Sequence, residues 1–212
     1  MDYLYEDKMS KLFIELYVPS EEEAPQYFDM LRRVSSYEIL TYIKKMQACL
    51  PEVKSINIPQ FSNIDALNGV LDIVYSSENI TFEDIGYYFY PDSKINAQWK
   101  YGENHYKTAA LLGLTSWDKP YHVTEFGVEY MKIPKADRAE IRNKLILRIP
   151  IIQQVLIQST DRELKPLEIL CKYLAESTAK RRHSNVHVMV DLVLDSFDGK
   201  QKIELIENIK WK

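Results

Sequence analysis

Apolar residues recur every three or four positions along most of the chain, a spacing typical of helices with one buried face. The clearest run lies in residues 61–132 and predicts three short helices. They start at Ser62 or Asn63, after Thr81, and near Asn96. The segment TSWDKPYHV that follows predicts a two-stranded wing. Three helices and a β-hairpin in this order are typical of a winged helix-turn-helix.

The third predicted helix, between Asn96 and Leu112, has an apolar and a polar side. Its alanines and leucines are expected to face inward, and Gly113 supplies the left-handed residue that ends it. The polar side suits DNA, because Asn pairs with adenine edges and Lys with guanine or phosphate. The candidates expected to be exposed there are Lys100, Tyr101, Asn104, His105 and Lys107. In the wing, Lys119 is expected to lie over a phosphate.

Apolar residues also have helical spacing before and after this central unit. Residues 1–60 predict an acidic helical arm and linker, with helices starting at Ser20 and Ser36. Residues 133–212 predict a second helical or winged-helix unit, whose last residues can close as a strand. The expected fold is therefore mainly α, with one winged helix at 61–132 between these two parts.

The charges are unevenly distributed along the chain. The formal net charge of −4 argues against indiscriminate binding to nucleic acid. Residues 1–30 hold eight acids and two lysines, whereas residues 132–148 hold six bases and two acids. In the basic stretch, Arg138, Arg142 and Lys144 are expected on the outer face of a helix. A second basic cluster consists of Lys180, Arg181 and Arg182. An acidic end and a basic face are compatible with DNA binding despite the acidic total.

Cysteine usage and hydropathy indicate the compartment. Cys49 and Cys171 lie in apolar-periodic runs, which predicts reduced, buried thiols in an intracellular protein. No apolar run approaches the roughly 20 residues of a membrane span. The first residues lack the basic and apolar regions of a signal peptide. We therefore expect a cytoplasmic protein with no membrane partner.

Three segments carry a resemblance to a known family. They are HYKTAALLGL followed by VTEFG, then LILRIPIIQQVL, and then STAKRRHSNVHVMVDLV. In this order and spacing they resemble the tandem winged-helix DNA-binding modules found with bacterial type II restriction endonucleases and related defence proteins. The resemblance covers residues 61–197, and the chain departs from the pattern at Asn185, Val188 and Val190, where the family favours Thr, Trp and Trp.

The resemblance implies a specific set of DNA contacts. Duplex DNA would be bound by the helix around Asn104 to Lys107 and by Lys180, Arg181 and Arg182. Ser184 and Asn185 stand beside the arginine pair and match the usual mixture of groups that contact the DNA backbone. The protein would be the recognition part, a partner or a regulator of a bacterial restriction or phage-defence system.

Two other functions stay open. A magnesium-dependent DNA endonuclease would need two or three carboxylates and a lysine around the metal. The PDSK sequence at Pro91 to Lys94 resembles part of such a motif but falls in a predicted turn, and Asp191 and Asp195 share a helix face without a His or Glu to complete a set. The other alternative is a non-catalytic module that holds protein. The sequence favours DNA binding without intrinsic catalysis and without a cofactor, with Mg²⁺ only for an endonuclease. A nuclease, a methyltransferase or a second copy of the chain are the protein partners to consider.

Overall fold

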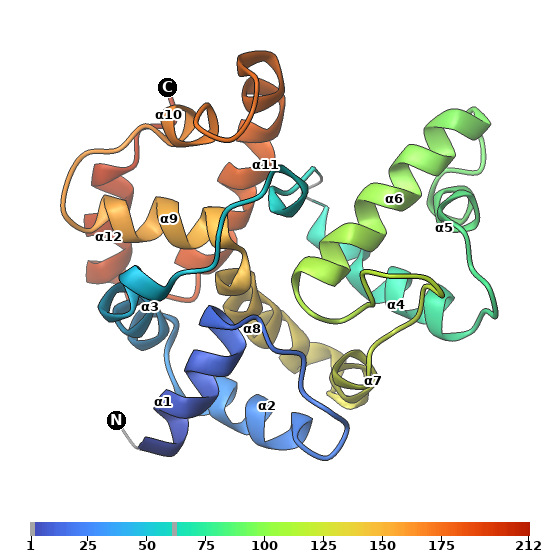
Figure 1. The fold of residues 1–212 in the computed structure, drawn as a ribbon, viewed down its shortest axis with the longest axis horizontal. Coiled ribbons are helices and arrows are strands. Elements are labelled where there is room, and N and C mark those ends of the chain that lie inside the picture. Colours follow the sequence, from blue (N-terminus) through green and yellow to red (C-terminus); the bar gives the residue numbers. More distant parts are fainter. Residues whose placement is uncertain (1–2, 61–62) are drawn as a thin grey trace.

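Helices make up most of the computed structural model, which describes residues 3–60 and 63–212 (Figure 1). This confirms the mainly α fold class. The described residues contain no extended strand, only two isolated bridges, Thr115 with Val123 and Leu164 with Ile209. The predicted helix start at Ser62 lies outside the described residues.

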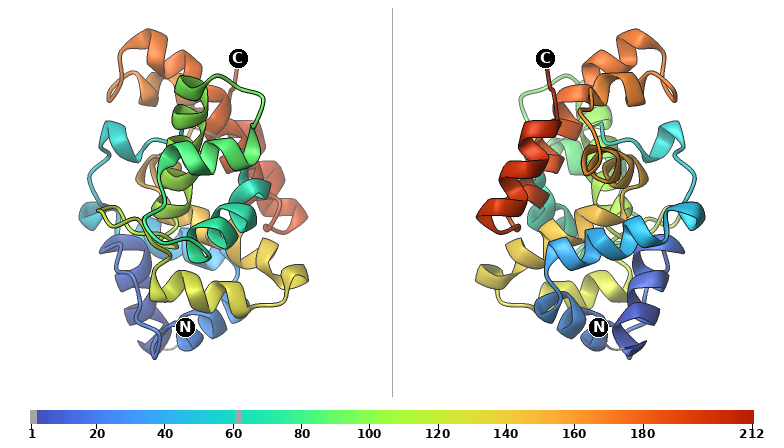
Figure 2. Two further views of the ribbon diagram at one scale, coloured as in Figure 1. Left: turned by 90° about the vertical axis from the view of Figure 1, so that its right-hand side faces the viewer. Right: turned by 90° about the vertical axis from the view of Figure 1, so that its left-hand side faces the viewer.

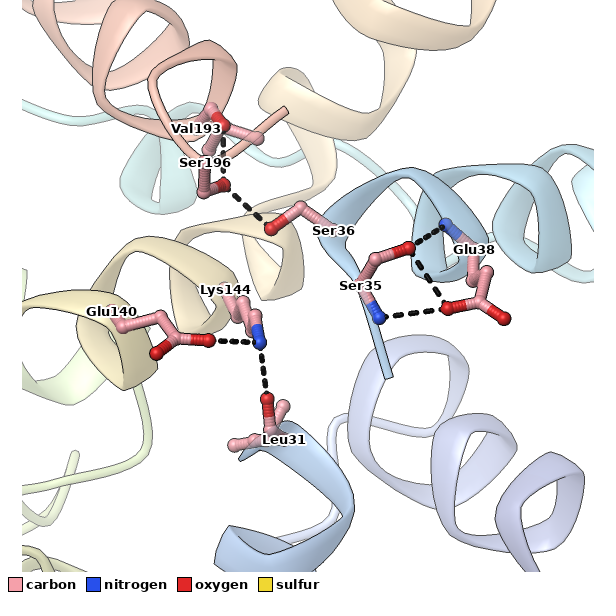
Figure 3. Close-up of polar contacts among 8 residues, drawn as sticks. All are labelled: Leu31, Ser35, Ser36, Glu38, Glu140, Lys144, Val193 and Ser196. Atoms are coloured by element: carbon pink, nitrogen blue, oxygen red, sulfur yellow. Dashed lines mark hydrogen bonds and ion pairs between the residues drawn. The ribbon is translucent and has the colours of Figure 1, made fainter. Parts of the chain in front are cut away.

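The acidic N-terminal segment forms α1 (Tyr3–Met9), the π-helical turn η1 (Ser10–Ile14), α2 (Ala24–Arg33) and α3 (Ser36–Lys45). Helix α2 begins at Ala24, four residues after the predicted start at Ser20, and in the turn between them the Glu23 carboxylate accepts hydrogen bonds from the Ser20 amide and hydroxyl. The start at Ser36 is confirmed, with Ser35 and Glu38 forming a capping box (Figure 3).

The central residues form α4 (Leu67–Tyr75), α5 (Phe82–Phe89), α6 (Ile95–Leu111) and α7 (Glu125–Lys132). Thr81 caps α5 in a capping box with Asp84. Gly113 follows α6 with a φ of +80°, the left-handed conformation that the sequence predicts. The predicted two-stranded wing is instead a loop, residues 115–123, closed by one antiparallel bridge.

The last part of the chain forms α8 (Lys135–Leu145), η5 (Ile146–Arg148), α9 (Pro150–Ser159), α10 (Pro166–Leu170), α11 (Glu176–Leu194) and α12 (Gly199–Asn208). The expected closing strand is a helix, α12, followed by the single parallel bridge of Ile209 to Leu164.

One hydrophobic core joins these parts. It includes Met9 and Phe13 of the N-terminal segment together with Val155 of α9 and Val190 of α11, all fully buried. Gln153 of α9 donates a 2.7 Å hydrogen bond to the Phe13 carbonyl oxygen, which fixes the N-terminal segment to the centre of the molecule.

Arg138 and Lys144 of α8 are buried and Arg142 is half-buried, so their predicted position on an outer face is wrong. Arg138 donates to the Ile133 carbonyl and to the Asn68 side chain of α4, and Arg142 donates to Asp65. Lys144 is buried and donates to Glu140 and to the Leu31 carbonyl at the end of α2 (Figure 3). Long basic side chains can span between helices while their charged ends reach carbonyl oxygens, so these residues connect the three parts of the chain.

Arg148 of η5 is also buried. Its two terminal nitrogens donate to the carbonyl oxygens of Leu16 and Tyr17, at 3.0 and 2.8 Å. Burial lowers the pKa of the guanidinium to about 10, which keeps it charged at neutral pH. The same side chain lies against Gly113, where an added Cβ would come within 3.0 Å of it. Arg148 therefore joins the N-terminal segment to the end of α6.

Two further sequence predictions concern the cysteines and the membrane. Cys49, in a 3-10 turn after α3, and Cys171, just after α10, are both unpaired and exposed, so the prediction of buried thiols is wrong. Within residues 3–60 and 63–212, none of the helices combines the length and the apolar content that crossing a membrane requires.

Candidate nucleic-acid interface

Helices α5 and α6 cross at two glycines. A Cβ added at Gly86 would lie 1.8 Å from the Gln98 carbonyl oxygen, and one added at Gly102 would lie 1.7 Å from the Phe82 carbonyl oxygen. No residue with a side chain fits at either point without moving the backbone. The two glycines therefore allow the close approach of α5 and α6.

The turn between α5 and α6 is held by one side chain. Gln98 is buried and its amide nitrogen donates to the carbonyl oxygens of Tyr90 and Pro91, at 3.1 and 3.0 Å. The PDSK sequence lies in this turn, as expected. The first turn of α6 is thereby fixed relative to α5.

The first half of α6 is open to solvent and basic. Its exposed residues are Ile95, Asn96, Trp99, Lys100 and Tyr101. Residues 93–102 contain two lysines and no acid. The predicted exposure of Lys100 and Tyr101 is confirmed. Asn96 and Trp99 are exposed as well, so the open side of the helix begins about one turn earlier than the sequence predicts.

The second half of α6 packs against its neighbours, and the predicted exposure of His105 is wrong. The His105 ring is 3% exposed, stacks on Phe89 with centroids 4.8 Å apart, and donates to the Tyr101 carbonyl oxygen at 2.7 Å. Burial lowers the pKa of His105. Asn104 and Lys107 are half-buried. The open surface of the helix therefore ends near Tyr101.

Glu103 forms ion pairs with both lysines of α6, Lys100 and Lys107. Its carboxylate accepts from Lys100 on one side and from Lys107, at 2.7 Å, on the other. Burial alone would raise the pKa of Glu103, but these hydrogen bonds bring it below its usual value. In the free protein both positive charges are thus partly neutralised by one buried carboxylate.

The 115–123 loop packs against Phe82 at the start of α5 and against Tyr106 in the second half of α6. Its Tyr121 ring stacks on Phe82 at 4.6 Å, and Phe82 makes an edge contact with Trp99 at 5.6 Å. Lys119 lies 5.7 Å from the Tyr121 ring centre, as a cation above an aromatic face. The Ser116 hydroxyl donates to the Asp118 carbonyl and pairs with the Tyr106 hydroxyl at 2.9 Å. Side chains, in place of a strand ladder, therefore hold the loop that carries Lys119.

The predicted basic cluster of α11 divides into outward and inward residues. Arg181 and Ser184 are exposed, and Lys180 is exposed in a 2.6 Å pair with Glu176. Arg182 faces inward and donates to the carbonyl oxygens of Ser55 and Ile58, at 2.6 and 3.0 Å. This internal role has no local signal in the sequence, because the acceptors lie more than 120 residues away. Asn185 is half-buried.

The beginnings of α6 and α11 lie on the same side of the molecule, in the upper part of Figure 1, and α1 and α2 of the acidic segment lie at the opposite end. Figure 2 shows the same vertical arrangement in two side views. The starts of α6 and α11, which carry the exposed bases Lys100 and Arg181, therefore lie toward the same end of the molecule.

Of the carboxylates considered for a metal site, Asp92 of PDSK is exposed in the turn before α6, and Asp191 and Asp195 lie at the end of α11. Asp191 is 3.3 Å from His187, and Asp195 is paired with Lys202 of α12. His187 stacks on Trp211 at 4.0 Å. Across residues 3–60 and 63–212, no group of three or more His, Cys, Asp or Glu side chains is arranged to hold a metal ion.

Comparison of the chain with protein-family models, with curated proteins and with solved structures finds no match in any of the three. What the molecule does is therefore inferred from its residues and their arrangement.

Proposed function

We propose that this chain binds double-stranded DNA through the first halves of α6 and α11, as a tandem winged-helix module in the bacterial cytoplasm. One observation supports this most strongly. The starts of α6 and α11 lie in the same upper part of the molecule, and each carries an exposed base, Lys100 in α6 and Arg181 in α11.

The shape of the α4–α6 unit fits a DNA groove. Helix α5 crosses α6 at Gly86 and Gly102, and the turn between them is braced by Gln98. Helix-turn-helix proteins place the first residues of the second helix against base edges in the major groove. In α6 these residues include Asn96 and Lys100, whose side chains suit adenine and guanine or phosphate.

The 115–123 loop takes the place of the wing in this proposal. It follows the recognition helix, and its ends are joined by the Thr115 to Val123 bridge. Lys119 lies over the ring of Tyr121, which packs on Phe82 of α5 and Tyr106 of α6. A lysine there can bind a phosphate next to the groove that α6 occupies.

The α10–α11 pair forms the second DNA-binding element of the proposal. Helix α10 is followed by a short turn and by α11, in which Lys180, Arg181 and Ser184 are exposed. Arg182 supports this element from behind, because it binds the 55–58 turn. The exposed pair of Lys180 with Glu176 is weak and can be exchanged for a phosphate contact.

The biological setting follows from the motif resemblance described above. A DNA-binding chain of this kind would act as the recognition part, partner or regulator of a restriction or phage-defence system. A nuclease or a methyltransferase would then supply the chemistry.

A charge-reversal experiment tests the proposal. Arg181→Glu should lower the affinity for a mixed-sequence duplex at least tenfold at low salt, because a phosphate contact is replaced by repulsion. Lys200→Glu, at an exposed base of α12, is the matched control and should change the affinity little. Fluorescence anisotropy with a labelled duplex measures both, and equal effects of the two variants would reject the role of α11.

A further inference from the structure

An exposed apolar stripe runs beside the polar stripe of α6. Ile95 is 64% exposed and Trp99, one helical turn later, is 45% exposed. Asn96 and Lys100 have the same spacing and form the adjacent polar stripe. An exposed Ile and Trp one turn apart on a helix braced on its other side offer a small apolar surface to a partner.

The surroundings favour nucleic acid as that partner. Lys94 and Lys100 flank the stripe, and residues 93–102 contain no acid. Lys119 stands on the neighbouring loop, connected through Tyr121, Phe82 and Trp99. Positive charge around a small apolar surface complements the groove of a duplex, whose rims are phosphates and whose floor carries base edges.

The stripe is held in place before any ligand binds. Trp99 meets the Phe82 ring edge-on at 5.6 Å, and Phe82 is buried beneath the loop that carries Tyr121. Gln98 fixes the turn that precedes Ile95 through two backbone carbonyls. A rigid apolar surface loses little conformational entropy on binding, which suits it to recognise one small group.

The apolar group that the major groove offers is the methyl on C5 of a pyrimidine. We infer that Ile95, with Trp99 beside it, contacts a C5-methyl group while Asn96 and Lys100 bind neighbouring polar edges or phosphate. The inference rests on the proposed function of α6. Thymine and 5-methylcytosine present the same methyl group at the same place, so either can be the source.

The experiment begins with selection of duplexes from a random-sequence library by the full chain. Each thymine of the enriched sequence is then replaced by uracil, which lacks only the methyl group, and each cytosine by 5-methylcytosine. Burial of one methyl group corresponds to about a fourfold change in affinity. A loss of that size with uracil identifies thymine as the source, and a gain of that size identifies 5-methylcytosine.

Two variants assign the effect to the stripe. Ile95→Ala should abolish the dependence on the methyl group and leave the salt dependence of binding unchanged, because no phosphate contact is removed. Ile203→Ala, at a similarly exposed isoleucine of α12, should keep the dependence.

The possible failures are distinguishable. Three results overturn the inference while leaving duplex binding in place. The selection enriches no sequence, the replaced duplexes all bind with equal affinity, or the methyl effect persists in Ile95→Ala. If the chain binds no duplex at all, both the inference and the proposed function fall.

Discussion

The substitution Gly102→Ala, at the crossing of α5 and α6, should destabilise the fold. The new Cβ would lie 1.7 Å from the Phe82 carbonyl oxygen, so an ordinary contact of 3.4 Å needs a displacement of about 1.7 Å between two helix backbones. Such a displacement removes packing along the whole crossing and costs about 3 kcal/mol or more. The better helix propensity of Ala returns only about 1 kcal/mol. The net effect is therefore a loss of about 2 kcal/mol or more.

Urea denaturation followed by circular dichroism measures this loss as a lower midpoint. Gly199→Ala is the matched control, because nothing lies within 4 Å of a Cβ at that position in α12. The control should keep or slightly raise the stability. Gly102→Ala should also weaken duplex binding, since α6 would be moved or freed. Gly102→Ala with the stability of the wild type would refute the close crossing of α5 and α6.

Three further predictions test the interior and the charge of α6. Arg148→Met leaves two backbone carbonyls of the N-terminal segment without their donor and should lower the free energy of unfolding, measured by urea titration, by about 2 kcal/mol. The control Arg33→Met removes an exposed ion pair and should change that free energy by less than about 1 kcal/mol. In the folded protein the pKa of His105 lies below its usual value of 6.5, so the unfolded chain takes up the proton at a higher pH than the folded chain. The free energy of unfolding should therefore fall as the pH drops below about 6.5. Urea midpoints measured between about pH 7.5 and 5.5 should show this fall in the wild type, and His105→Phe should lack this part of it. Glu103→Gln releases the two lysines that its carboxylate holds and should raise duplex affinity several-fold in anisotropy at low salt; an unchanged affinity would show that these lysines do not face the DNA.

Local signals in the sequence were sufficient to predict most of the helices. Thr81 with Asp84 forms the expected cap, and Gly113 takes the expected left-handed conformation. Both depend on residues within a few positions of each other, and such short-range chemistry can be read from the sequence alone. The turn between α5 and α6 was predicted for the same reason.

The interior positions of charged residues could not be predicted in this way. Helical spacing places Lys144 and Arg138 on a polar side, but their acceptors are carbonyl oxygens of α2 and of the 131–133 turn. Arg182 likewise binds the 55–58 turn. Which carbonyls a long side chain reaches depends on how distant segments pack, and that information is absent from local periodicity.

The position of α6 could be predicted from the sequence, but the extent of its open surface could not, because that extent also depends on packing between distant segments. Helix α6 was located, but its open surface lies nearer its start, because His105 stacks on Phe89 of α5. A stack between two helices has no local signature. The wing was expected as two strands, whereas Ser116 and Tyr106 close the loop through their side chains.

The central claim, that the first halves of α6 and α11 bind duplex DNA, is tested most directly by the salt dependence of binding. Anisotropy with a labelled duplex at 50 to 300 mM salt should give a steep linear fall of log affinity with log salt concentration, with a slope of about −0.9 for each phosphate contacted. Lys180→Gln with Arg181→Gln should make that slope shallower by about 2. Absence of duplex binding even at the lowest salt concentration, or a slope that the double variant leaves unchanged, would contradict the account.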